Sequence, residues 1–152
     1  MEMKDREQAK KENERKKEYL NRYLESVRAI RRAEEELQEI RIMKMGISAS
    51  GDGMPHGGGQ SDLSNYAATL DDIERDLRAA KRRRVRTYIE IRNTIESIKN
   101  SKERDVIFYR YIKGMDWWEI AEKMKYTERW VKKLHGKALA HMERQKEFPK
   151  VP

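Results

Sequence analysis

Two long segments of the sequence carry apolar residues at spacings of three, four or seven, the periodicity of helices that pack along a narrow seam. The first segment holds Leu20, Tyr23, Val27, Ile30, Leu37 and Ile40. The second holds Leu63, Tyr66, Leu70, Ile73 and Leu77, followed after an interruption by Val85, Tyr88, Ile91, Ile95 and Ile98. This pattern predicts an all-α fold in which long helices bury their seams on each other or on a second chain.

The stretch between these segments predicts a connection that reverses the chain. Residues 45–62 (MGISASGDGMPHGGGQSD) hold six of the eight glycines and one of the three prolines, a composition that breaks helices. We therefore expect a loop there, within a coiled-coil-like helical hairpin over residues 19–98. Residues 1–18 interleave acidic and basic side chains without an apolar seam. We expect them to form a charged N-terminal extension that is frayed or disordered and buries nothing.

After residue 100 the apolar spacing changes to that of three short helices, over residues 101–146, followed by a tail at 147–152. Gly114 allows a turn after the first helix, and Asp116 and Thr127 are positioned to cap the second and third. The small Ala121 lets another helix cross closely. The residues expected to face inward are Val106, Ile107, Tyr111, Trp117, Ile120, Ala121, Met124, Val131, Leu134 and Ala138. This arrangement is typical of a helix-turn-helix.

The same region is strongly basic, which indicates an anionic partner. Residues 123–146 contain eight lysines and arginines against two glutamates. A polyphosphate backbone is the commonest partner of such a segment. We predict binding to double-stranded DNA through the outward side of the third helix. The alternative is that the three helices are purely structural and cap the hairpin, with a basic side that only faces solvent. The predicted DNA-binding residues are Thr127, Glu128, Arg129, Trp130, Lys132, Lys133 and Lys137.

Two stretches of this region resemble a known family. EIAEKMKYTERWVKKLHGKAL is similar to region 4 of bacterial sigma factors, which reads the upstream promoter element, and KERDVIFYRYIKGMDWWEIA resembles the helix that precedes it. The resemblance covers about 45 residues. Sigma factors tend to have glycine at the position of Lys125, an acidic residue at that of Arg129 and a basic one at that of Trp130. The resemblance implies a helix-turn-helix that binds promoter DNA.

The whole chain resembles small proteins of phages and prophages of Gram-positive bacteria, among them the RinA-like and ArpU-like late transcriptional regulators. The resemblance implies a sequence-specific transcriptional regulator of a phage or prophage. We expect such a regulator to be a monomer or homodimer, and the absence of cysteine favours the reducing cytoplasm, here of a bacterial host cell. One alternative is a recognition subunit for phage DNA packaging, similar to small terminases. Another alternative is an adaptor that binds RNA polymerase and does not contact DNA. Trp118 is a candidate partner contact, because its neighbour Trp117 takes the inward position and adjacent helix residues cannot both face the core.

Other classes of chemistry find little support in the sequence. There is no cysteine, and the histidines lack metal-ligand spacing, so we expect no metal, cofactor or catalytic residue. No apolar run is long enough to span a membrane, so we expect no membrane partner. An arginine cluster interrupts the second seam. It forms either a solvated helix face or a surface that contacts DNA phosphate or an acidic partner. It consists of Arg82, Arg83, Arg84 and Arg86.

Overall fold

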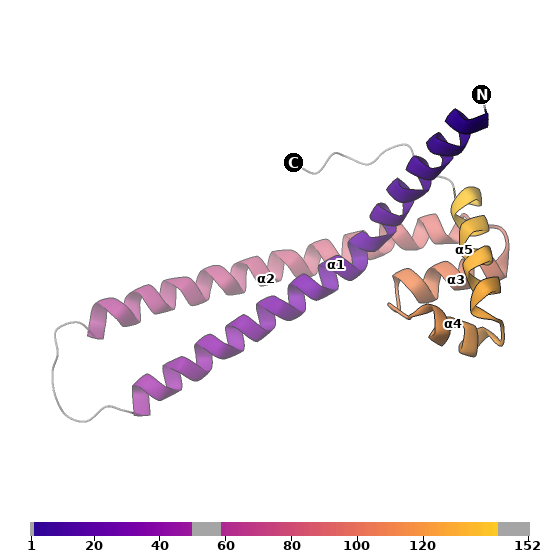
Figure 1. Cartoon of the computed structure of the whole chain (residues 1–152). Coiled ribbons are helices and arrows are strands. Elements are labelled where there is room, and N and C mark those ends of the chain that lie inside the picture. Colours follow the sequence, from indigo (N-terminus) through magenta and orange to yellow (C-terminus); the bar gives the residue numbers. More distant parts are fainter. Residues whose placement is uncertain (1, 50–58, 143–152) are drawn as a thin grey trace. The chain divides into compact units, whose positions relative to one another are not determined.

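The computed structural model of the chain describes residues 2–49 and 59–142 (Figure 1). Their regular elements are all helices, which confirms the all-α class. The helices are α1 (Glu2–Ala49), α2 (Gly59–Glu96), α3 (Ser101–Tyr111), α4 (Trp117–Met124) and α5 (Glu128–His141). Residues 50–58 of the predicted loop, including His56, lie outside the described residues, as do residues 143–146 of the predicted C-terminal module and the predicted tail at 147–152.

The ends of the predicted loop are helical instead. Helix α1 continues through residues 45–49, and α2 already begins at Gly59. Residues 45–49 contain a single glycine, Gly46, among methionine, isoleucine, serine and alanine. One glycine in a helix costs only about 1 kcal/mol relative to alanine, which does not stop a long helix from extending. The prediction of a loop was therefore wrong for both of its ends.

The chain divides into two compact units, and this division differs from the predicted one. The central unit comprises residues 26–85, and the terminal unit comprises residues 1–25 together with residues 86–152. The sequence predicts a hairpin over residues 19–98 that is separate from the C-terminal helices. In the structure, both outer ends of that hairpin belong to the same unit as α3, α4 and α5.

In the central unit, α1 and α2 run side by side in opposite directions and bury their seams on each other (Figure 1). Tyr66 donates a hydrogen bond from its hydroxyl to the carbonyl of Ile40 at 2.6 Å. The ion pairs Arg41–Glu74 and Lys81–Glu34 also join the two helices. The buried seam residues are Ile30, Leu37 and Leu77, with Ala33, Leu70, Ile73 and Ala80 half-buried against them. The expected packing of seam on seam is therefore present in this unit.

The terminal unit has a core to which both halves of the predicted hairpin contribute. Tyr19 and Leu20 of α1 pack in one cluster with residues of α2, α3 and α5, and Leu20 is completely buried. The other buried members are Ile91, Ile95, Ile98, Ile107, Tyr111, Ala138, Leu139 and Met142. This shared core is the physical reason why residues 1–25 and 86–98 group with the C-terminal helices.

Lys16 ties the N-terminal helix to α5. Its ammonium group is buried and donates a hydrogen bond to the carbonyl oxygen of Leu139 at 2.7 Å, with Glu12 at 3.8 Å. Leu139 lies in the last turn of α5, where carbonyls lack partners within the helix and a positive charge is favourable. The expectation that residues 1–18 are frayed and bury nothing is thus wrong. A buried lysine stem is tolerated there because its charged end finds an acceptor.

The seam of α2 takes a different course from the predicted one near the arginine cluster. Val85 is 55 % exposed, whereas Thr87 and Thr94 are buried. Thr94 satisfies its hydroxyl by bonding the carbonyl of Glu90 at 3.1 Å and the hydroxyl of Tyr19 at 3.2 Å. A threonine that bonds its own helix in this way can occupy a core position. The predicted position of Val85 on the seam is therefore wrong, because polar threonines take the core positions nearby.

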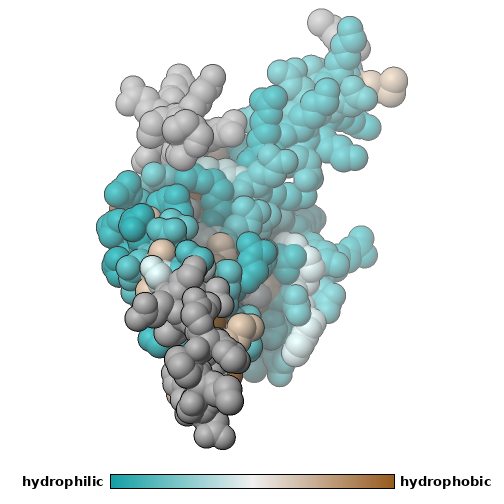
Figure 2. All heavy atoms as spheres, turned by 90° about the vertical axis from the view of Figure 1, so that its left-hand side faces the viewer, coloured by the Kyte–Doolittle hydropathy of each residue, from teal (hydrophilic) through white to brown (hydrophobic). Residues whose placement is uncertain are grey.

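The surface of the described residues is mostly hydrophilic in the view of Figure 2. This agrees with a sequence in which 41 % of residues are charged. None of the described helices has both the length and the apolar character needed to cross a membrane.

Candidate nucleic-acid interface

The local structure that positions α5 follows from its flanking residues. Gly114, at φ 68°, turns the chain between α3 and α4, and the backbone N–H of Asp116 donates to Glu119 at the start of α4. Lys125, at φ 61°, ends α4 in the left-handed conformation. Thr127 then begins α5, because its hydroxyl accepts a hydrogen bond from the backbone N–H of Trp130 at 3.2 Å. Both predicted caps and the predicted turn are present.

One side of α5 is fixed by a second apolar cluster. Val131 is completely buried and Leu134 nearly so, against residues of α3 and α4. The remaining buried members are Val106, Ile120 and Ala121, with Tyr109, Met115, Trp117, Met124 and Tyr126 half-buried around them. The residues expected to face inward are buried or half-buried, and the structure adds Tyr109, Met115 and Tyr126 to this cluster and buries His135 on α5, which the apolar pattern did not predict. A helix held in this way presents its opposite side in a defined orientation.

The opposite side of α5 carries a dense group of exposed cations, which we call the basic face: Arg129, Lys132, Lys133 and Lys137. Glu128 and Thr127 are also exposed at the start of the helix. Among residues 2–49 and 59–142, no carboxylate forms an ion pair with any of the four cations. The structure thus leaves their charge available to an external anion.

Trp130 organises one edge of the basic face. The residue is 38 % exposed, and the ammonium groups of Lys133 and Lys137 lie over its ring, 5.6 and 5.3 Å from the ring centroid. A cation above an indole ring is attracted by the electrons of the ring face, so both lysines are held along the same flank of the helix. Lys133 and Lys137 follow Trp130 by three and seven residues, a helical spacing that predicts this contact; the expected role of Trp130 was only that of a DNA contact.

The other predicted contact residue, Trp118, lies on α4 and not on α5. The residue is 56 % exposed, which confirms the expectation that it cannot join Trp117 on the inward side of the helix. Trp117 is held by the guanidinium group of Arg110, 4.3 Å from its ring centroid. In the arginine cluster of α2, Arg84 is half-buried and the other three side chains are exposed.

A buried polar pair lies beneath the basic face. The hydroxyl of Tyr111 and Nε2 of His135 share a hydrogen bond at 2.8 Å, and the rings of Trp117 and His135 form a T-shaped pair with centroids 4.9 Å apart. Burial raises the pKa of Tyr111 to about 12. Burial, followed by the positive charges of Lys17 and Arg110, lowers the pKa of His135 to about 4. His135 is therefore a neutral core residue at pH 7.

This buried histidine predicts a loss of stability in mild acid. In the unfolded chain the pKa of a histidine is about 6.5, so between pH 6.5 and 4 the unfolded state binds a proton that folded His135 does not. The free energy of unfolding should fall as the pH drops through this window, by about 3 kcal/mol in all, and this contribution should level off below pH 4. Urea unfolding of the parent and of His135→Gln at pH 7, 5.5 and 4.5 measures the difference. Parallel pH profiles would contradict it.

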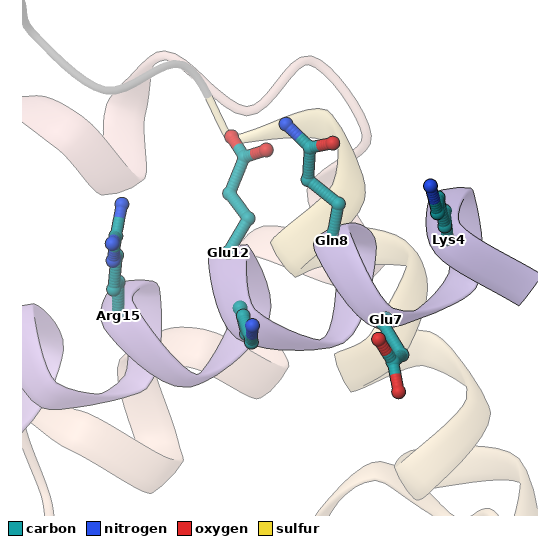
Figure 3. A pocket seen from close by; sticks show the side chains of 6 residues that line it. Lys4, Glu7, Gln8, Glu12 and Arg15 are labelled. Carbon is teal, nitrogen blue, oxygen red and sulfur yellow. The ribbon is translucent and has the colours of Figure 1, made fainter.

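No other part of the described chain offers a better site. A hollow of about 490 Å³ runs along the start of α1 (Figure 3). Lys4, Gln8, Glu12 and Arg15 point to one side of the helix and Glu7 to the other. All of its lining side chains, Lys11 included, are charged or polar and come from one helix. Among the described residues, no group of three or more histidine, aspartate or glutamate side chains is placed to hold a metal ion.

Comparison with known proteins gives a family but no activity. A family model described as "Protein of unknown function (DUF1492)" matches residues 58–143, more than half of the chain, from the start of α2 through α5. The chain belongs to this family. No curated protein and no solved structure matches it.

Proposed function

We propose that the chain is a sequence-specific DNA-binding transcriptional regulator in which α4 and α5 form a helix-turn-helix. The observation that carries the proposal is the basic face, since its four cations lie on a helix fixed by its opposite side and have no internal ion pairs among the described residues. An α-helix fits the major groove of double-stranded DNA, where such long donors reach base edges and phosphates.

The residues of the basic face are proposed to differ in role. Arg129 lies in the first turn of α5, the part of a recognition helix that contacts base edges, and its two-pronged donor group suits guanine. Lys132, Lys133 and Lys137 are single point charges suited to phosphates. The resemblance to sigma region 4 supports the same assignment, and the resemblance to phage regulators supports an origin in a phage or prophage.

Selection from a random duplex library tests the proposal directly. The full chain should enrich a common sequence motif, and fluorescence anisotropy should show tighter binding to that motif than to a shuffled duplex. The affinity should fall steeply as salt rises, because phosphate contacts release counterions. If no duplex is enriched and no salt-dependent binding is measured at low salt, the proposal is wrong.

Host RNA polymerase is proposed as a second partner, through Trp118. Exposed tryptophans are enriched among the residues that dominate protein interfaces, and Trp118 is the most exposed aromatic of the three C-terminal helices. Trp118→Ala should reduce the amount of purified polymerase that copurifies with the protein, without changing the affinity of the protein for duplex DNA. Unchanged copurification would remove this partner and leave the DNA-binding proposal intact.

A further inference from the structure

Gly136 lies within α5 at a position where the structure gives no internal reason for glycine. Its φ is not positive, in contrast to that of Gly114. A Cβ atom added at Gly136 would meet nothing within 4 Å, whereas one at Gly114 would lie 3.4 Å from Leu24. Neither the backbone conformation nor the packing of the described residues therefore requires glycine at position 136.

The absence of a side chain at Gly136 weakens the helix. Glycine loses more backbone entropy on folding than alanine and is the least favourable residue in a helix interior apart from proline. Helix α5 carries this cost in its second half, between the buried residues His135 and Ala138 that hold it in place.

The surroundings of Gly136 indicate what approaches it. Lys132 and Lys133 lie four and three residues before it, one turn back on the same side of the helix, and Lys137 follows it directly. These cations are exposed and form no ion pair with the described carboxylates. A polyanion bound to the basic face can therefore contact the helix backbone directly at Gly136, between the lysines.

We infer that Gly136 is the point at which DNA approaches α5 most closely, and that its missing side chain sets the depth of the helix in the groove. This inference rests on the proposed function. Gly136 acts as a positioning residue: it makes no polar contact itself, but it lets the lysines around it reach the phosphates together. A side chain there would hold the helix away and lengthen all of those contacts.

Two substitutions at Gly136 and one matched control test the inference in the full chain. Gly136→Ala should raise Tm by about 2 °C while lowering the affinity for the selected duplex several-fold, and Gly136→Leu should lower that affinity by about tenfold or more. Gly46 is the control, since it is also an exposed helical glycine with nothing within 4 Å of an added Cβ. Gly46→Ala should leave DNA binding unchanged.

The decisive result is the opposite direction of the two effects at Gly136, because a variant that is more stable cannot lose affinity through misfolding. If Gly136→Leu binds the duplex as tightly as the parent while removal of Lys132 and Lys133 weakens binding, the close approach is wrong and the proposed DNA interface stands. If the parent binds no duplex at all, both fall together.

Discussion

The double substitution Lys132→Ala and Lys133→Ala is expected to weaken binding to double-stranded DNA by about 10- to 100-fold near physiological salt. Both ammonium groups are exposed on α5 without an ion pair among the described residues, so their removal costs the fold little and takes two charges from the basic face. Each lost phosphate contact should also flatten the dependence of log affinity on log salt by about 0.9. Anisotropy titrations with one duplex at several salt concentrations measure both quantities.

The control for this experiment changes the same charge elsewhere. Lys10 and Lys11 are adjacent exposed lysines on α1, and their double replacement by alanine lowers the net charge equally. If the effect depends on net charge alone, the two double variants will lose affinity alike, and the basic face will have no special role. A loss confined to Lys132 and Lys133, with a changed salt slope, assigns the contacts to α5.

The arrangement of α3, α4 and α5 could be predicted because its determinants are local. Asp116 and Thr127 act within one turn of their own positions, and Gly114 acts through its own backbone conformation. The apolar period of each short helix then decides which side is buried. Each of these signals lies within a few residues of the sequence. The exposed side of α5 could therefore also be predicted, as the side that carries none of the periodic apolar residues.

The composition of the terminal unit could not be predicted in this way. The helical period of α1 shows that Leu20 faces a partner, but it does not show whether that partner is α2 alone or also α3 and α5. Lys16 gives no apolar signal, yet it is buried through a hydrogen bond to Leu139, 123 residues later in the chain. Contacts at such separation depend on the assembled fold and leave no local mark in the sequence.

The candidate site shows the same division. The cations of the basic face are evident from charge and helical spacing, and the stacking of Lys133 and Lys137 on Trp130 follows from the same spacing. The significance of Gly136 could not be read from the sequence, because a glycine in a helix is usually explained by a close neighbour. Only the placement of every surrounding element shows that this neighbour is missing.

The contribution of the N-terminal helix is open to a direct stability test. Leu20→Ala removes a completely buried side chain from the cluster that includes Ile91 and Ile107, and it should lower the free energy of unfolding by about 2 to 5 kcal/mol. Ile42→Ala, at a position on the same helix that is 48 % exposed, should change it by less than about 0.5 kcal/mol.

Urea unfolding followed by circular dichroism and by tryptophan fluorescence measures both changes in the free energy of unfolding. All three tryptophans lie on α4 and α5. A fluorescence transition that Leu20→Ala leaves in place would show that α3, α4 and α5 fold without α1, as the sequence-based boundary predicts, and the shared core would be wrong.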